Sequence, residues 1–295
     1  EHIDVERNLS KLTIRDYRHY LVRFTDWLTN NHIDDITKFD MDQLKRYRVY
    51  LSQFVDDRGQ TLSRTTQSYH VIALRSFMKW MIKNDIGALA PEKIDLPKGE
   101  SRSLKFLKND QVERLLAQPE ISEKTGLRDK AMLEVLFSTG LRVSELVSLN
   151  REQVDTVRRE FGVIGKGRKP RVVFLTESAC KWVDQYLRGR EDQWRPVFIR
   201  YSRGEAPITS SGEDMRLTTR SVQRMVDKYC RKAHLPVKIT PHGLRHSFAT
   251  DLLMNGAGLR DVQEMLGHKN VSTTQIYTHV TRRELREVHE KFHSK

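Results

Sequence analysis

Apolar side chains recur at helical spacing along the first part of the chain. In "DYRHYLVRFTDWL" (residues 16–28) they occupy the i, i+3, i+4 and i+7 positions that form one face of a helix. The same period continues in "MDQLKRYRVYLSQF" (41–54) and in "TTQSYHVIALRSFMKWMIKN" (65–84). The pattern therefore predicts three helices, each with an apolar face that must be buried.

The third predicted helix separates apolar from basic positions. Val71, Leu74 and Met78 share one stripe, which we interpret as core. Arg75 and Lys79 fall among the exposed positions of the same helix. We therefore expect a small helical bundle with basic outer faces.

A segment without helical periodicity follows the bundle. "APEKIDLPKGESRSLKFL" (90–107) contains two prolines, a glycine and many charges, a composition typical of an extended linker. We place the domain boundary there, with a helical domain over residues 1–93, a linker over 94–105 and a second domain over 106–295.

The second domain is helical with one interruption. "RDKAMLEVLFSTG" ends on Gly140, a residue suited to stop a helix, and "LRVSELVSL" starts again directly after it. Then "EFGVIGKGRKPRVVFL" (160–175) places a Gly-Lys-Gly turn between two apolar runs, which predicts a β-hairpin with Lys166 at its turn. Further helices are expected at "SACKWVDQYL", "TTRSVQRMVDKYCRKAHL", "PHGLRHSFATDLL" and "GLRDVQEML".

The predicted fold is therefore mainly α, with one small β-hairpin. The polar segment 200–217 lies between two of the predicted helices and is expected to be a flexible surface loop.

Composition narrows the class of partner. The 295 residues carry a formal net charge of +13, an excess that favours a polyanion such as nucleic acid, although a basic enzyme with a solvated surface is the simpler alternative. The two cysteines, Cys180 and Cys230, lie in helical patterns and are expected to be buried thiols. No apolar run is long enough to span a membrane and no signal peptide opens the chain, so we expect a cytoplasmic protein.

Four short motifs carry the candidate chemistry: "TGLRVSEL", "GKGRKPR", "HGLRHSFAT" and "LGHKNVSTTQIYTHV". Each is weak by itself, because a solvated arginine, a solubilising lysine or a packed tyrosine is the commoner case. Together they supply many cationic donors and few carboxylates. Such a set suits a phosphodiester, since arginines stabilise a pentacoordinate transition state, lysine or histidine moves a proton, and a tyrosine hydroxyl attacks phosphorus. No metal or other cofactor is then required.

These motifs, in this order, resemble the tyrosine recombinase (phage integrase) family, and most closely its Xer-type site-specific recombinases. The resemblance implies that Tyr277 is the nucleophile and forms a 3′-phosphotyrosine link with DNA. It assigns Glu145 the role of supporting the first arginine. The implied catalytic set is Arg142, Lys166, His242, Arg245, His268 and Tyr277.

The resemblance also implies an architecture and partners. An N-terminal helical, SAM-like core-binding domain would precede a mixed α+β catalytic domain, and both would bind a double-stranded recombination site. Expected DNA contacts are Arg75, Lys79, Arg168 and Lys169. Four protomers, either identical or of two kinds, would assemble on paired sites and exchange strands through a Holliday junction. The expected role is chromosome dimer resolution, with a DNA translocase as a possible activator.

Other interpretations stay open at this point. His242 and His246 have the i, i+4 spacing of a zinc site, but Arg245 between them disfavours a metallohydrolase. A non-catalytic DNA-binding protein fits the composition equally well and has no use for Tyr277. Within the enzyme class, a type IB topoisomerase uses similar chemistry, and an integrase of a phage or mobile element shares the motifs.

The end of the chain carries two local patterns. Ser272 and Gln275 match a capping box, which predicts a helix that contains Tyr277. In the predicted C-terminal helix 282–295, Leu285, Val288 and Phe292 form a narrow apolar stripe. Because so short a helix is unstable alone, the stripe must be buried. The family resemblance favours burial in a neighbouring protomer, with helix exchange between protomers.

Overall fold

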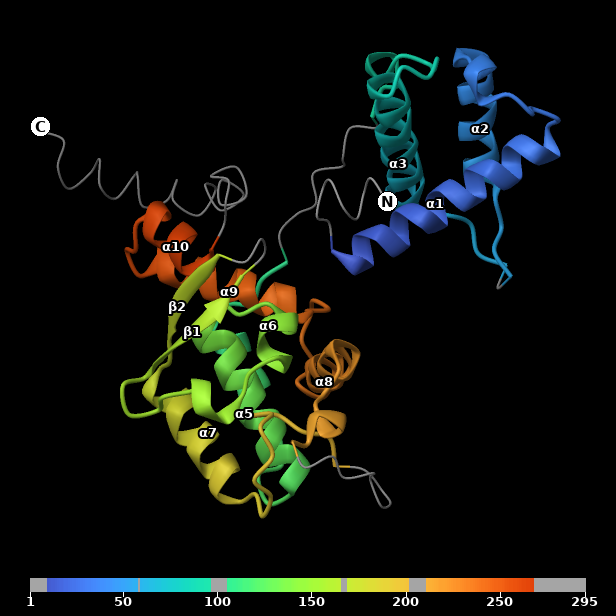
Figure 1. Cartoon of the computed structure of the whole chain (residues 1–295). Helices are drawn as coiled ribbons and strands as arrows, with labels where there is room; N and C mark the ends of the chain where they lie inside the picture. The colour runs from blue at the N-terminus through green and yellow to red at the C-terminus, as the bar shows by residue number, and fades with distance from the viewer. Residues whose placement is uncertain (1–9, 58, 97–104, 166–168, 202–210, 268–295) are drawn as a thin grey trace, which may run out of the picture. The chain divides into compact units, whose positions relative to one another are not determined.

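The computed structural model describes residues 10–57, 59–96, 105–165, 169–201 and 211–267. The chain forms two compact units, residues 1–102 and residues 103–295 (Figure 1). Each unit has a hydrophobic core of its own.

The first unit contains the three predicted helices, α1 (Lys11–Asn30), α2 (Met41–Gln53) and α3 (Arg64–Lys83). Side-chain caps start each of them. Ser10 and Ser63 accept backbone N–H bonds at α1 and α3, and Asp40 forms a reciprocal capping box at α2. Two short 3-10 turns, Ile36–Lys38 and Pro91–Lys93, complete the unit.

The core of the first unit follows the predicted apolar stripes. Phe24 and Trp27 of α1 pack against Tyr47 of α2, and Met78 of α3 is fully buried in the same cluster. Ile94, the first residue of the expected linker, is also fully buried there. The packed part of this unit therefore extends at least to Ile94.

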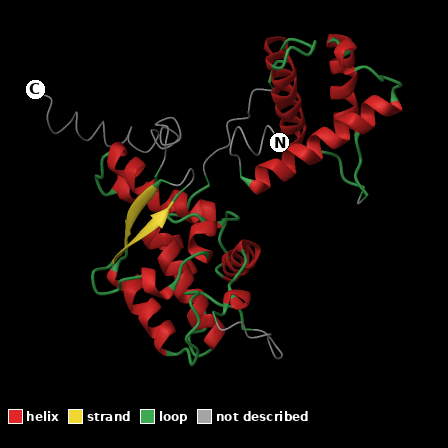
Figure 2. Ribbon diagram, viewed as in Figure 1, coloured by secondary structure: helices red, strands yellow, loops and turns green. Residues whose placement is uncertain are grey.

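The second unit is helical around one hairpin (Figure 2). Its helices are α4 (Asn109–Leu116), α5 (Lys124–Thr139), α6 (Val143–Val147), α7 (Glu177–Arg188), α8 (Thr219–Lys232), α9 (Pro241–Met254) and α10 (Leu259–Leu266), with 3-10 turns at Arg151–Gln153 and Glu213–Met215. The sequence pattern did not predict α4. Helix α5 packs against α7 and α9 and is buried on most of its faces, as expected of a central helix.

The hairpin is the predicted one. Strands β1 (Glu160–Ile164) and β2 (Pro170–Phe174) pair antiparallel, with Phe161 opposite Val173. Phe161 and Val173 are buried, whereas Val172 and Phe174 on the other face of β2 are about half exposed. Period-2 alternation therefore turns one face of the hairpin toward the helices. Over the described residues the fold is mainly α with a small two-stranded sheet, as predicted.

The expectation of a flexible loop over residues 200–217 is wrong for its second part. Residues 211–217 contain the 3-10 turn Glu213–Met215, and Met215 and Leu217 are buried. Arg216 donates hydrogen bonds to the backbone carbonyls of Val147 and Leu149. Met215, Arg216 and Leu217 therefore anchor this segment to the core, although most of their neighbours in the sequence are polar.

The two cysteines are buried free thiols, as expected. Within the described residues, every helix falls short of the length and hydrophobicity that a membrane crossing requires.

Gly140 ends α5 in a place that only glycine fits. Its φ is +59°, and an added Cβ would lie 2.4 Å from Cδ1 of Phe248 in α9. We predict that Gly140→Ala lowers the free energy of unfolding by about 1–2 kcal/mol for the backbone, and by about 1–3 kcal/mol more for the overlap. Urea unfolding measures the loss. Gly256→Ala is the matched control, because Gly256 also has a positive φ (+88°) but open space around it. Equal losses in the two variants would contradict the packing role of Gly140.

Candidate active site

The short helix α6 begins with an ionic capping arrangement. The backbone N–H of Arg142 donates to Oε2 of Glu145 (2.8 Å), and Nη1 of Arg142 donates to Oε1 (2.9 Å). One carboxylate thus satisfies a free amide at the helix start and fixes a guanidinium beside it. The Arg142 side chain stays 29% exposed, whereas that of Glu145 is 7% exposed. Arg142 is therefore held in place yet remains open to a ligand.

A second arginine binds the same carboxylate. Nη1 and Nη2 of Arg171, on β2, donate to Oε1 and Oε2 of Glu145 at 3.0 and 2.8 Å. Burial by itself would raise the pKa of Glu145, but the bonds from Arg171 and Arg142 outweigh it and lower the pKa to about 2. Glu145 is therefore an anion at neutral pH, and its charge is shared between two guanidinium groups.

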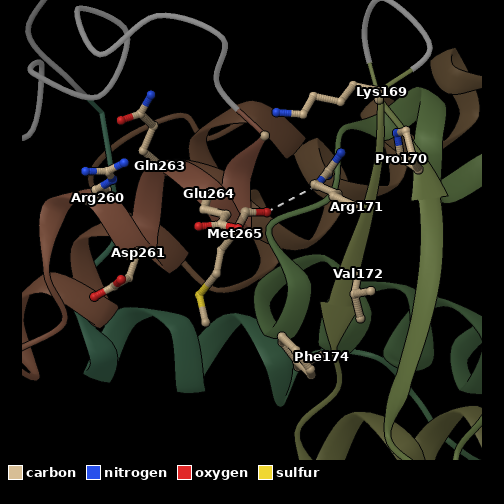
Figure 3. A pocket seen from close by; sticks show the side chains of 12 residues that line it. Lys169, Pro170, Arg171, Val172, Phe174, Arg260, Asp261, Gln263, Glu264 and Met265 are labelled. Atoms are coloured by element: carbon tan, nitrogen blue, oxygen red, sulfur yellow. Dashed lines mark hydrogen bonds between the residues drawn. The ribbon is translucent and has the colours of Figure 1, made fainter.

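Arg171 also reaches α10. Its Nε donates to the carbonyl oxygen of Met265 at 3.1 Å (Figure 3). This carbonyl belongs to the last turn of α10, where backbone oxygens lack a partner within the helix. The positive guanidinium meets the negative end of the helix dipole there. The hairpin, α6 and α10 are thus joined through one side chain.

Arg245 is the most deeply buried arginine of the site. Its side chain lies in α9 and the residue is 2% exposed. Nη1 donates to the carbonyl oxygen of Gly140 at 2.6 Å, and Nη2 donates to that of Leu266. These two carbonyls stand at the C-terminal ends of α5 and α10. Arg245 therefore caps two helices at once, which offsets part of the cost of burying its charge.

His242 lies one turn before Arg245 on α9, near the start of the helix. It is exposed, and partial desolvation together with the charges of Arg245 and Arg142 lowers its pKa. His246 follows on the same face, with its ring centroid 4.3 Å from that of His242, and burial lowers its pKa to about 4. Neutral imidazoles are thereby favoured beside two arginines.

The structure brings together four of the predicted site residues, namely Arg142, Glu145, His242 and Arg245, where the end of α5, α6 and α9 meet. Lys166, Arg168, His268, Tyr277 and the helix 282–295 lie outside the described residues, so their placement stays a prediction. Lys169 is exposed and borders a pocket of about 670 Å³ between β2 and α10 (Figure 3). In the first unit, Lys79 is exposed and Arg75 is half-buried.

Sequence reasoning missed Arg171. The residue stands in the quoted motif "GKGRKPR", but only Lys166, Arg168 and Lys169 of that motif were assigned a role. A signal was present in the strand period. Arg171 is two residues before the buried Val173 and so belongs to the inward face of the hairpin. A basic residue on a buried face requires an acidic partner.

The zinc alternative rested on His242 and His246. The two rings are neighbours, but the described residues hold no group of three or more His, Cys, Asp or Glu side chains placed to bind a metal ion.

Glu145 should link the stability of this site to pH. Its pKa is about 2 in the folded protein against 4.5 for a free glutamate, so its contribution is complete above about pH 4.5 and disappears as the pH falls through the folded pKa. We predict that Glu145→Gln lowers the free energy of unfolding by on the order of 3 kcal/mol at pH 7.

The difference from the wild type should shrink in urea titrations at about pH 3. Glu113→Gln, at an exposed position of α4, is the control and should leave the free energy of unfolding unchanged at both pH values. A pH-independent difference for Glu145→Gln would show that packing, not charge, explains the loss.

Comparisons with known proteins identify the family of the chain. The sequence pattern of the phage integrase family matches residues 105–284, and that of the phage integrase N-terminal SAM-like domain matches residues 1–85. The tyrosine recombinases XerD of Staphylococcus epidermidis and Staphylococcus aureus are each 35% identical to the chain over 292 residues, which cover 99% of this chain and 95% of theirs.

Solved structures show the same fold. The XerA recombinase is 29% identical, with a TM-score of 0.54 over 98% of this chain and 95% of that one. The XerH site-specific recombinase, solved bound to a palindromic difH substrate, has a TM-score of 0.73 at 24% identity and covers 96% of this chain and 80% of that one. The chain therefore belongs to the phage integrase family and, like the Xer proteins it resembles, it is a site-specific tyrosine recombinase.

Proposed function

We propose that this recombinase cleaves and rejoins DNA by attack of Tyr277 on a backbone phosphate. The observation that carries the proposal is the convergence of Arg142, Arg245 and His242. Glu145 holds the guanidinium of Arg142, carbonyls at two helix ends hold that of Arg245, and His242 lies within the influence of both charges. Two guanidinium groups held by internal bonds form a preorganised site for a phosphoryl group, since they need no rearrangement as charge develops on it.

The proposed step balances without an external reagent. The Tyr277 oxygen forms a bond to phosphorus, and the bond from phosphorus to the 5′-oxygen breaks. A 3′-phosphotyrosine link and a free 5′-hydroxyl result. The leaving 5′-oxygen takes a proton, and we assign Lys166 as its donor. The proton of the tyrosine hydroxyl passes to a base such as a histidine. Attack by a 5′-hydroxyl on the link reverses the step, so the phosphodiester energy is retained and no ATP is needed.

Several features support DNA as the substrate. The formal net charge of +13 gives the chain a strong attraction for a polyanion. Lys79 and Lys169 are exposed, and with Arg75 and Arg168 they are the assigned DNA contacts. In this proposal residues 1–93 form the core-binding domain and residues 106–295 form the catalytic domain. The predicted linker 94–105 joins them, and its first residue, Ile94, packs in the core of the first unit. The XerH relative was solved bound to its palindromic difH substrate, and the Tn1549 transposon integrase, which has a similar fold, in complex with transposon right end DNA.

The biological role follows from the Xer likeness, which extends over 99% of the chain. We propose that four protomers, of one or two kinds, pair two sites and exchange strands through a Holliday junction in the cytoplasm. Chromosome dimer resolution is the proposed purpose, with a DNA translocase as activator.

Covalent trapping tests the nucleophile directly. Genomic DNA fragments that the protein captures covalently are sequenced first, and a duplex nicked beside the recovered cleavage point then serves as a suicide substrate. The wild type should form a 3′-phosphotyrosyl adduct in the presence of excess EDTA, and Tyr277→Phe should form none. Equal trapping by Tyr277→Phe would refute the assignment. Loss of wild-type trapping in EDTA, with DNA binding intact, would contradict the metal-free chemistry.

Removal of residues 283–295 tests the proposed exchange of the C-terminal helix. The apolar stripe Leu285, Val288 and Phe292 must be buried, and burial in a neighbouring protomer would link the nucleophile to assembly. Gel shifts on half-sites and full sites should show weakened cooperative assembly but nearly unchanged single-site binding. A matched full-length variant, Leu285→Ala with Phe292→Ala, should behave in the same way. A truncated protein that assembles and cleaves like the wild type would contradict the exchange.

A further inference from the structure

We infer that Arg171 is a positioning residue for strand cleavage: through Glu145 it fixes Arg142 relative to the last turn of α10. This inference rests on the proposed function, because it names a residue that would prepare the same site. Nothing in the sequence motifs assigned Arg171 a role. Its contacts, burial and surroundings all point to one.

The contacts of Arg171 are internal. Its side chain is 9% exposed, and within the described parts of the chain it donates hydrogen bonds to both oxygens of Glu145 and to the Met265 carbonyl. A guanidinium committed in this way does not reach a DNA phosphate. Arg171 instead acts through Glu145, whose carboxylate also binds the partly exposed side chain of Arg142.

The shape of the guanidinium matters as much as its charge. The N–H groups of Nη1 and Nη2 match the two carboxylate oxygens of Glu145. The Nε–H of the same guanidinium points to the Met265 carbonyl in the last turn of α10 (Figure 3). A lysine carries the same charge on a single nitrogen, which does not span a carboxylate and a helix end in this geometry. Charge and positioning can therefore be separated by experiment.

Two glycines leave room for this side chain. A Cβ added to Gly165 would lie 3.1 Å from Nη1 of Arg171, and one added to Gly267 would lie 3.0 Å from its Cδ. Gly165 follows β1, and Gly267 is the C-cap of α10 with a φ of +63°. In sequence, these glycines directly precede Lys166 and His268. The end of β1 and the end of α10 thus both pack against the one guanidinium.

The sharing of Glu145 explains why cleavage should depend on Arg171. Oε1 of Glu145 accepts one bond from Arg142 and one from Arg171. Without Arg171, Arg142 would be the one ionic partner left to the buried carboxylate among the described residues, and the carboxylate would draw that guanidinium inward. Arg142 would then be less available to the phosphate in the transition state, whereas contacts to the rest of the DNA would persist.

The test compares Arg171→Lys and Arg171→Met with the wild type on the nicked suicide duplex. At saturating protein, adduct formation should slow by about 10- to 100-fold, the size of couplings found inside one ion-pair network. The Kd for the same duplex should change by less than about threefold, because the lost contacts are not with DNA.

Arg190→Lys is the matched control. Arg190 is also a buried arginine that binds a carboxylate, Asp192, and the backbone carbonyls of Pro196 and Val197. We expect Arg190→Lys to lower Tm without slowing adduct formation. All rates are compared at a temperature at which circular dichroism shows each variant folded. If Arg171→Met does not fold, Arg171→Lys, which retains the charge, decides the question.

A double-mutant cycle adds a result that general destabilisation would not give. If Arg171 acts through Glu145, then Arg171→Met combined with Glu145→Gln should cleave no more than about twofold more slowly than the slower single variant. If the loss of cleavage rate in the double variant equals the product of the two single losses, Arg171 acts independently of Glu145, and the inference would be wrong.

Other outcomes separate the inference from the proposed function. If Arg171→Lys cleaves at the wild-type rate while Tyr277→Phe forms no adduct, the proposed function stands and the positioning role is wrong. The role is also wrong if Kd and cleavage rate worsen in equal proportion. If the wild type forms no adduct on any DNA, the proposed function fails and the role of Arg171 fails with it.

Discussion

The site depends on one buried carboxylate. Glu145 accepts hydrogen bonds from the Arg142 backbone, from the Arg142 side chain and from both terminal nitrogens of Arg171. Removing a carboxylate from water is costly, and the cost is offset only when every lone pair is used. The low pKa of Glu145, about 2, expresses how fully its charge is satisfied. An acidic residue thus assembles a cationic site, since two guanidinium groups would otherwise repel each other.

Helix ends supply the remaining negative charge. Arg245 binds carbonyls at the C-terminal ends of α5 and α10, and Arg171 binds the Met265 carbonyl in the same last turn of α10. Unpaired carbonyls at a helix end carry the negative pole of its dipole. The positions of the arginines are therefore tied to where these helices stop. Gly140 and Gly267, both with positive φ, set those stops. The backbone conformation at these two glycines therefore also determines where the arginines of the site find negative charge.

Local pattern predicted the features that have local causes. The apolar stripes of α1 and α3, the Gly140 stop and the antiparallel pair of β1 and β2 were all accessible from the sequence. The sequence also singled out Arg142, Glu145, His242 and Arg245, which the structure brings together. Arg171 was not singled out, because its partners Glu145 and Met265 are 26 and 94 residues away in the chain. The packing of Met215 and Leu217 was missed for the same reason, since polar neighbours hid a segment whose contacts are distant. The positions of Lys166, His268 and Tyr277 stay predictions.

The most direct measurement is the titration of Glu145 itself. Selective 13C labelling of glutamate side chains, with Glu145→Gln to assign the signal, follows the carboxyl carbon by NMR as the pH is lowered. We expect no titration of this carboxyl between pH 7 and about pH 3.5, because its pKa is about 2. A midpoint near the ordinary glutamate value, about 4.3, would mean that the carboxylate is solvated. It would then hold neither arginine, and the proposed organisation of the site would be wrong.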